Sequence, residues 1–108
     1  KTAGIYTVGG ISLNKETKTV TVDGVPVTLT PLEFNILHLL IKSPGRIYSS
    51  EEIYESVWNE ESIGSERSVA VHIRHLRQKI EVNPSEPRYL KVVWGLGYKM
   101  EEIGYGRD

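Results

Sequence analysis

The sequence contains no cysteine among its 108 residues. This absence excludes disulfide bonds, thiolate catalysis and cysteine metal sites, and it is typical of proteins in a reducing compartment. Long hydrophobic runs are also missing, because the longest, Ile36 to Ile41, contains a histidine and is far too short to cross a membrane. The N-terminus lacks the charged and then apolar pattern of a secretion signal. We therefore expect a cytoplasmic protein without a membrane segment.

Signatures of catalysis and of cofactor binding are equally scarce. The sequence has no glycine-rich phosphate loop and no nucleophile motif, and its paired glutamates are adjacent in sequence, as helix-capping and solvated acids usually are. His72 and His75 lie one helical turn apart, but Arg74 lies beside them and no third metal ligand follows at a recognisable spacing. We expect neither enzyme activity nor a metal ion nor a cofactor.

An excess of positive charge is missing as well. The 13 Lys and Arg are offset by 14 Asp and Glu, which by itself argues against a nucleic-acid-binding domain. The charges are unevenly distributed, however. Residues 51–66 hold six acids and no base, and residues 67–80 hold four bases and no acid. Two adjacent segments of opposite sign indicate either two different partners or a pairing of helix against helix.

The basic segment, Glu66 to Ile80, has the pattern of an amphipathic helix. At about 100° per residue, four apolar residues fall on one narrow stripe that would face a core: Val69, Ile73, Leu76 and Ile80. The opposite side carries Arg67, Val71, Arg74, His75 and Gln78. Guanidinium and imidazole donors suit phosphate oxygens and base edges. A basic face that is merely solvated would have the same composition. The choice between a nucleic-acid-binding face and a solvated face therefore depends on the patterns in the rest of the chain.

Short alternating runs at the start of the chain predict strands at 5–8, 11–14, 19–22 and 25–29. Asp23-Gly24 between two of these runs is the strongest hairpin signal in the chain. Pro26 cannot donate to a β-ladder, so we expect either that its strand lies at a sheet edge or that this position faces away from the neighbouring strand. The first thirty residues therefore predict a small antiparallel sheet.

Two capping boxes, Thr30 with Glu33 and Ser49 with Glu52, mark the starts of two helices. The first is apolar nearly all round, as in a central helix, and His38 within it is read as structural or half-exposed. The second is short and precedes an acidic loop at 59–65. Residues 46–48 are compatible with a short extra strand. After the basic helix, strand-like runs at 88–93 and 98–103 predict a hairpin, which gives a helix-turn-helix with a wing.

Four motifs in this order resemble one family: residues 30–34, 57–58, 67–79 and 94–98. They are similar to the C-terminal effector domain of OmpR/PhoB-type response regulators, the transcription factors of bacterial two-component systems. The resemblance covers about residues 11–103. It implies an α+β fold, a winged helix-turn-helix with an N-terminal four-stranded antiparallel sheet, three helices and a C-terminal β-hairpin wing. We expect residues 1–108 to form this single domain, without the receiver domain that a sensor kinase phosphorylates.

The resemblance also implies roles for individual residues. Base edges would be approached by Ser68, Val71, His72 and His75. Phosphates would be held by Arg67, Arg74, Arg77 and the Trp58 indole N–H. The wing would contribute Trp94 and Tyr98. The helical wheel places His72 nearer the core border than the other base-contacting residues. Trp94 has two interpretations: its ring meets DNA, or it folds back over the core.

The partners implied by the resemblance are double-stranded DNA with tandem direct-repeat half-sites, a second copy of the chain on that DNA, and RNA polymerase. The loop expected to contact the polymerase comprises Asn59, Glu60, Glu61, Ser62 and Ile63. The alternative function is a winged-helix module that uses the same surface to bind a protein and has no specific DNA binding. The salt dependence of binding distinguishes the two, because counterion release makes DNA binding fall steeply with salt.

Overall fold

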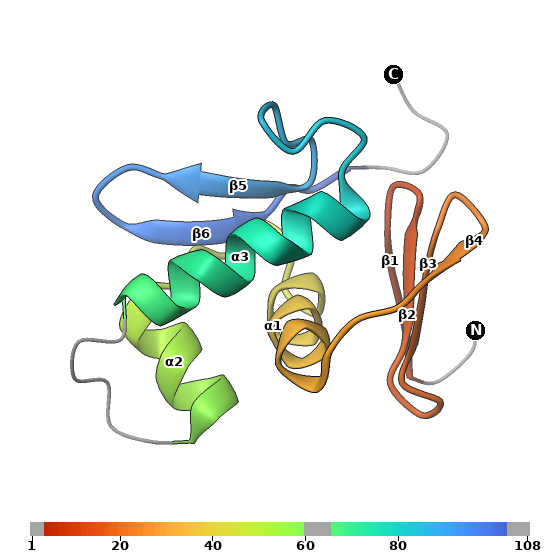
Figure 1. Ribbon diagram of the computed structural model, residues 1–108, viewed down its shortest axis with the longest axis horizontal. Helices are drawn as coiled ribbons and strands as arrows, with labels where there is room; N and C mark the ends of the chain where they lie inside the picture. Colours follow the sequence, from red (N-terminus) through yellow and green to blue (C-terminus); the bar gives the residue numbers. More distant parts are fainter. Residues whose placement is uncertain (1–3, 60–65, 104–108) are drawn as a thin grey trace.

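The computed structural model describes residues 4–59 and 66–103. A sheet of four strands comes first, three helices follow, and a two-stranded hairpin comes last (Figure 1). The strands of the sheet are β1 Ile5–Val8, β2 Ile11–Asn14, β3 Thr19–Val22 and β4 Val25–Val27. The helices are α1 Pro31–Ile41, α2 Ser50–Trp58 and α3 Glu66–Ile80, and the hairpin strands are β5 Leu90–Val93 and β6 Gly97–Met100.

The four-stranded sheet is antiparallel in the simple order β1-β2-β3-β4. Its turn between β3 and β4 has positive φ at both Asp23 (52°) and Gly24 (82°), the conformation that two-residue hairpins favour. The hairpin predicted there is confirmed, and so is the edge position of the strand with Pro26. That strand ends at Val27, two residues earlier than the predicted end at residue 29.

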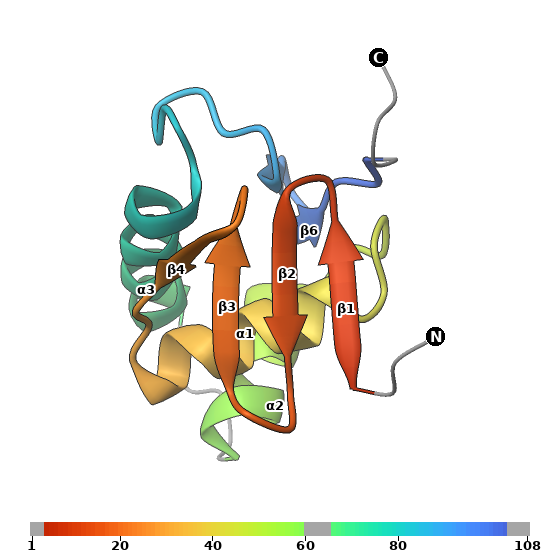
Figure 2. The same cartoon turned by 90° about the vertical axis from the view of Figure 1, so that its right-hand side faces the viewer.

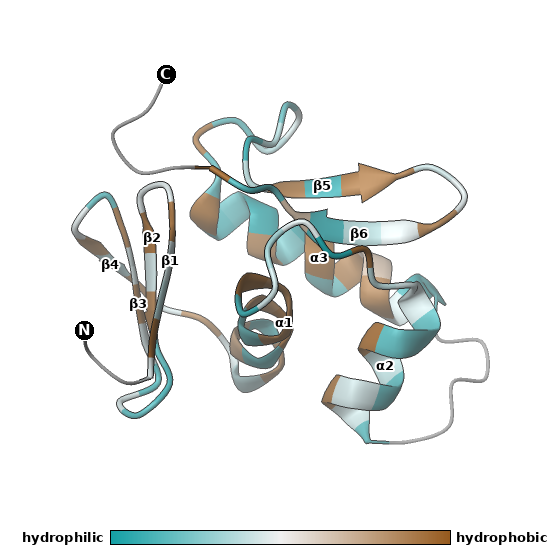
Figure 3. Cartoon of the chain, turned by 180° about the vertical axis from the view of Figure 1, so that it is seen from behind, coloured by the Kyte–Doolittle hydropathy of each residue, from teal (hydrophilic) through white to brown (hydrophobic). Residues whose placement is uncertain are grey.

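Helix α1 forms the centre of the molecule. It crosses one face of the sheet (Figure 2) and lies between the sheet and the other two helices (Figure 3). Its buried apolar residues are Phe34, Ile36, Leu37, Leu40 and Ile41. Both predicted capping boxes are confirmed, with Thr30 and Glu33 at α1 and Ser49 and Glu52 at α2. His38 is half-buried against the Tyr6 ring, 5.4 Å away between centroids, as its structural interpretation predicted.

The C-terminal hairpin is shorter than the predicted runs 88–93 and 98–103. The ladder of β5 begins at Leu90, and the backbone N–H groups of Arg88 and Tyr89 donate to the Glu81 carboxylate. Tyr48 adds one bridge to β6, with hydrogen bonds of 2.8 and 2.9 Å to Tyr98 in both directions. The extra strand expected at 46–48 is therefore reduced to this single bridge.

Backbone contacts also join the hairpin to the rest of the fold. Gly97 has φ of 146°, and a Cβ there would overlap the carbonyl oxygen of Tyr48, so only glycine fits this approach. The N–H of Gly9 donates to the Ile103 carbonyl at 3.1 Å, and the N–H of Gly10 donates to the Tyr89 hydroxyl at 3.0 Å. The end of the described chain therefore lies against the first hairpin of the sheet.

Within residues 4–59 and 66–103, no helix is long and apolar enough to span a membrane.

Candidate nucleic-acid interface

Helix α3 presents one face to the core and the other to solvent, as its pattern predicted. Val69, Ile73, Leu76 and Ile80 are at most 2% exposed. The exposed residues along the helix include Arg67, Ser68, Ala70, Arg74, His75 and Gln78, and Val71 is half-buried among them. Glu66 lies in the first turn, where a carboxylate suits the positive end of the helix dipole. The solvent side thus combines two exposed arginines with short polar and imidazole groups.

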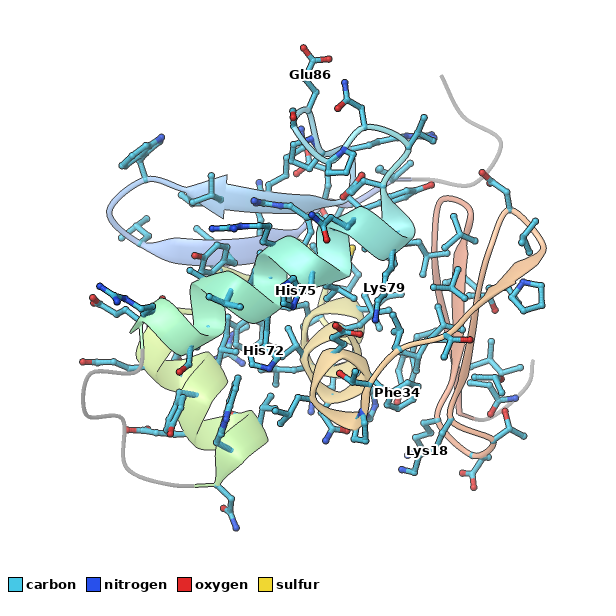
Figure 4. The ribbon with its side chains drawn as sticks, in the orientation of Figure 1. Lys18, Phe34, His72, His75, Lys79 and Glu86 are labelled. Carbon is cyan, nitrogen blue, oxygen red and sulfur yellow. The ribbon has the colours of Figure 1, made fainter. Side chains whose placement is uncertain are left out.

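An aromatic stack joins α2 to the start of this surface. The Trp58 ring stacks on Tyr54 at 4.7 Å between centroids and receives His72 edge-on at 5.1 Å. His72 Nδ1 lies 2.8 Å from the Ser68 carbonyl oxygen. Because a carbonyl oxygen only accepts, this nitrogen carries a hydrogen. His72 is half-buried at the border of the core, as the helical wheel indicated, whereas His75 is exposed (Figure 4).

Two of the four bases of α3 contact neighbouring elements of the protein, and one of them, Arg77, is a residue for which the resemblance implied a phosphate contact. Arg77 Nε donates to the Leu90 carbonyl at 3.0 Å, and its Nη2 atom is buried with no hydrogen-bond partner in the described parts of the chain. Lys79 Nζ is 2.6 Å from Glu33 Oε1 and reaches from α3 toward α1 (Figure 4). The helical wheel ignores neighbouring elements, so it could not show that the hairpin and α1 hold these two side chains.

The tip of the hairpin is exposed and apolar. Trp94 is 92% exposed, Leu96 60% and Val92 49%. Trp94 therefore does not fold back over the core, so the second interpretation of this residue is wrong. Tyr98 is half-buried beside Tyr48. The tip lines a hollow together with the starts of α2 and α3, which include Ser50 and Glu66, so the wing and α3 lie next to each other.

Of the loop predicted to contact the polymerase, only Asn59 is described. It ends α2 in the left-handed conformation, φ 61°, and its N–H donates to the Glu55 carbonyl at 3.1 Å. Glu60, Glu61, Ser62 and Ile63 lie outside the described residues. In the two described ranges, no three His, Cys, Asp or Glu residues form a group that could hold a metal ion.

Sequence reasoning missed Glu81, a buried carboxylate directly after α3. It is 7% exposed and accepts hydrogen bonds from three successive backbone N–H groups, those of Arg88, Tyr89 and Leu90. No local motif marks such a residue, because its partners lie seven to nine positions further along the chain. A buried acid among backbone donors shows only in the folded chain.

Comparisons with known proteins agree with this architecture. The family described as "Transcriptional regulatory protein, C terminal" matches residues 24–100. The chain is 40% identical over 93 residues to the uncharacterized transcriptional regulatory protein YcbL of Bacillus subtilis, and 38% identical over 100 residues to the alkaline phosphatase synthesis transcriptional regulatory protein SphR of Synechococcus elongatus. These alignments cover 86% and 93% of this chain but only 41% and 39% of the relatives.

Solved structures are similar over nearly the whole chain. The response regulator DrrB of Thermotoga maritima, an OmpR/PhoB homologue, superposes with a TM-score of 0.83 at 33% identity, covering 91% of this chain and 44% of DrrB. The DNA-binding domain of RstA from Klebsiella pneumoniae, solved in complex with the RstA box, also gives 0.83, at 27% identity and covering 90% and 96%. Both confirm the predicted α+β winged helix-turn-helix. The matched family is a regulatory domain rather than an enzyme. The chain belongs to this family of C-terminal domains of transcriptional regulatory proteins, and within it to the OmpR/PhoB-type effector domains of bacterial response regulators.

Proposed function

We propose that this domain binds double-stranded DNA in a sequence-specific manner and thereby controls transcription. The observation that carries the proposal is the solvent side of α3, where Arg67, Ser68, Arg74 and His75 lie exposed next to the exposed wing tip. A helix of this kind fits the major groove, and a neighbouring hairpin fits the adjacent groove. The RstA domain, with which the chain superposes over 90% of its length, was solved bound to its DNA box.

The side chains proposed to contact DNA have two roles. Arg67 and Arg74 hold phosphates, because a guanidinium makes bidentate bonds to phosphate oxygens. Ser68, Val71 and His75 approach base edges. His72 presents its Nε2 atom at the rim of the helix, and Trp58, which contacts His72, turns its indole N–H to a phosphate. On the wing, Trp94 enters the minor groove and Tyr98 supports its base.

Selection of binding sites from a random pool of duplexes tests this function directly. A recovered consensus must bind more tightly than its scrambled version, and the logarithm of affinity must fall linearly with the logarithm of salt concentration, as counterion release requires. The competing function is a winged-helix module that binds a protein through the same face. If no consensus is recovered and the affinity for DNA is the same for every duplex sequence, the protein-binding module is favoured.

The domain is expected to act in pairs on DNA. A single module buries a limited area on DNA, so high specificity normally needs two half-sites. We propose tandem direct repeats, each bound by one copy of the chain, with half-site centres about one helical turn apart. Inserting about five base pairs turns one site to the opposite side of the helix. Cooperative binding must then disappear, and cooperativity that survives the insertion contradicts the tandem arrangement.

We propose that this domain is part of a longer protein. Its curated relatives YcbL and SphR are more than twice as long as the matched region. We propose that the longer protein is a cytoplasmic response regulator in which a sensor kinase phosphorylates a receiver domain and so controls this effector domain. Phosphotransfer from a cognate kinase to the full-length protein, followed by DNA-binding measurements, tests this assignment.

A further inference from the structure

The carboxylate of Glu81 binds the strand that leads into the wing. Glu81 Oε1 accepts from the Arg88 N–H at 2.7 Å, and Oε2 accepts from the N–H groups of Tyr89 and Leu90 at 3.0 and 2.9 Å. Glu81 itself continues α3, since its own N–H donates to the Arg77 carbonyl at 2.9 Å. Hydrogen bonds to an ionised acceptor are short and strong, and burial strengthens them. The last turn of α3 is thus fastened to the start of β5.

Arg77 binds the same strand from one helical turn earlier. Residues four apart lie on the same side of a helix, so Arg77 and Glu81 project together. Arg77 Nε donates to the Leu90 carbonyl at 3.0 Å, and Leu90 is fully buried. Both polar backbone groups of Leu90 are therefore bound by side chains at the end of α3. We call this pair, Glu81 and Arg77 on Leu90, the clamp.

The rest of the connection gives the wing little support. The segment between Glu81 and Arg88 is largely exposed, with Val82 at 99%. Next to the ladder of β5 and β6, the Glu101 N–H donates to the Tyr89 carbonyl at 2.8 Å. The tip beyond, with Trp94, is exposed. Orientation of the hairpin therefore depends on contacts at its base, which include the Tyr48–Tyr98 bridge and the clamp that fastens β5 to α3.

We infer that Glu81 and Arg77 are positioning residues that fix the angle between α3 and the wing, so that both elements reach neighbouring grooves of one duplex without reorganisation. This inference rests on the proposed DNA binding. It gives Arg77 a role inside the protein in place of the phosphate contact implied by the family resemblance, because Nε is occupied and Nη2 is buried. Preorganisation of this kind raises affinity by removing the entropy cost of ordering the wing on binding.

A DNA-free measurement tests the clamp itself. The sequence contains no cysteine, so Ala70→Cys on α3 and Leu96→Cys at the wing tip allow two spin labels at exposed sites. We expect a narrow distribution of label distances in the otherwise native chain and a broad one in Glu81→Gln, whose amide places donor hydrogens against backbone N–H groups. Glu86→Gln, an exposed glutamate in the connecting segment, is the matched control and must stay narrow. A narrow distribution in Glu81→Gln overturns the inference.

A double-mutant cycle on the selected duplex tests the consequence for binding. Trp94→Ala should weaken binding of the native domain by about tenfold, in the range of losing one aromatic–base contact, and by much less in the Glu81→Gln background. Equal effects in both backgrounds contradict the positioning role. Circular dichroism at the same temperature confirms that each variant is folded; if Glu81→Gln is not, Arg77→Gln takes its place in both experiments.

Arg77→Gln in the Trp94→Ala background separates positioning from phosphate binding. With the wing contact already removed, a positioning residue leaves the salt dependence unchanged, whereas a lost phosphate contact lowers its slope by about one unit. A lowered slope therefore overturns the assignment of Arg77. If the native domain prefers no sequence, the proposed function fails, while the spin-label result still decides whether the clamp orders the wing.

Discussion

Lys79 in the last turn of α3 and Glu33 in the first turn of α1 form an ion pair of 2.6 Å in which the glutamate side chain is only 4% exposed. Glu33 also accepts from the Thr30 N–H at 2.9 Å as part of the capping box. One carboxylate therefore caps α1 and anchors α3 to it. Because the carboxylate is buried, removing its cation leaves a charge with insufficient partners.

Lys79→Met should lower the free energy of unfolding at neutral pH by about 2 kcal/mol, the range for a hydrogen bond to a charged group. Burial by itself raises the pKa of Glu33, but the bonds from Lys79 and Thr30 outweigh it and hold the pKa below its ordinary 4.5. A lowered folded-state pKa gives stability that is complete above pH 4.5 and is lost as the pH falls through the folded value. Urea unfolding should therefore show the mutational difference shrinking below pH 4.5. Lys15→Met, at an exposed turn, is the control and should change little.

His38 should make the domain less stable in mild acid. Its burial lowers its pKa from 6.5, and the charges of Lys42, Lys15 and Lys18 lower it further. In the unfolded chain His38 takes up a proton near pH 6.5, whereas in the folded chain it does so only at a lower pH. The free energy of unfolding therefore falls as the pH decreases below 6.5. Urea unfolding between about pH 7.5 and 5.5 should show a weaker dependence in His38→Gln. The exposed His75→Gln serves as control, and an equal dependence in native protein and His38→Gln would refute the account.

The two neighbouring residues on the solvent side of α3 should have separable effects. Loss of the base contact in His75→Ala is expected to relax specificity by roughly 1–3 kcal/mol, whereas Arg74→Ala should weaken all sequences alike and lower the salt slope by about one unit. Titrations on the selected and scrambled duplexes at several salt concentrations measure both quantities. If both variants lose specificity equally, this division of roles is wrong.

Trp94→Ala should reduce affinity for DNA and leave the melting temperature nearly unchanged. The side chain is 92% exposed, so its removal leaves no cavity in the core. Trp58→Ala provides the contrast, because Trp58 stacks on Tyr54 and contacts His72, and its loss should lower the melting temperature. Thermal unfolding of both variants without DNA would contradict this prediction if Trp94→Ala proved the more damaging.

Variants of the acidic loop at 59–65 should affect transcription and leave DNA binding unchanged. Glu60 and Glu61 would repel DNA if they faced it, so we propose that they serve contact with RNA polymerase. The double variant Glu60→Ala/Glu61→Ala should bind the operator normally and lower transcription in a reconstituted assay. Glu51→Ala/Glu55→Ala, on the preceding helix α2, is a control of equal charge change. Unchanged transcription in the loop variant would remove the activating role.

The local patterns of the sequence were sufficient to predict the order of the elements. Alternation, the Asp23-Gly24 turn and the two capping boxes act over a few residues, so they can be read without the fold. The stripe from Val69 to Ile80 likewise shows which side of α3 faces the core. These features predicted the fold and the exposed surface of the candidate site.

Contacts between distant residues could not be predicted in this way. Lys79 and Glu33 are 46 positions apart, and α3 would carry the same basic pattern whether or not α1 lay beside it. Glu81 is one more acid in a chain with 14 acidic residues, and only the fold brings it to the backbone of Arg88 to Leu90. The exposure of Trp94 depended on where the hairpin points, which the glycines around it leave open.

The contacts of Gly9 and Gly10 with the end of the described chain have a consequence for the order of folding. The four-stranded sheet contains only neighbouring strands, so it pairs at small loop-closure cost. Its contact with Tyr89 joins residues 79 positions apart, and its contact with Ile103 spans still more of the chain, so on a ribosome both partners emerge after the sheet and the three helices. We expect the nascent chain to pack the sheet against α1 first and to gain the contacts of Gly9 and Gly10 only after the wing is synthesised, so that the wing completes the core.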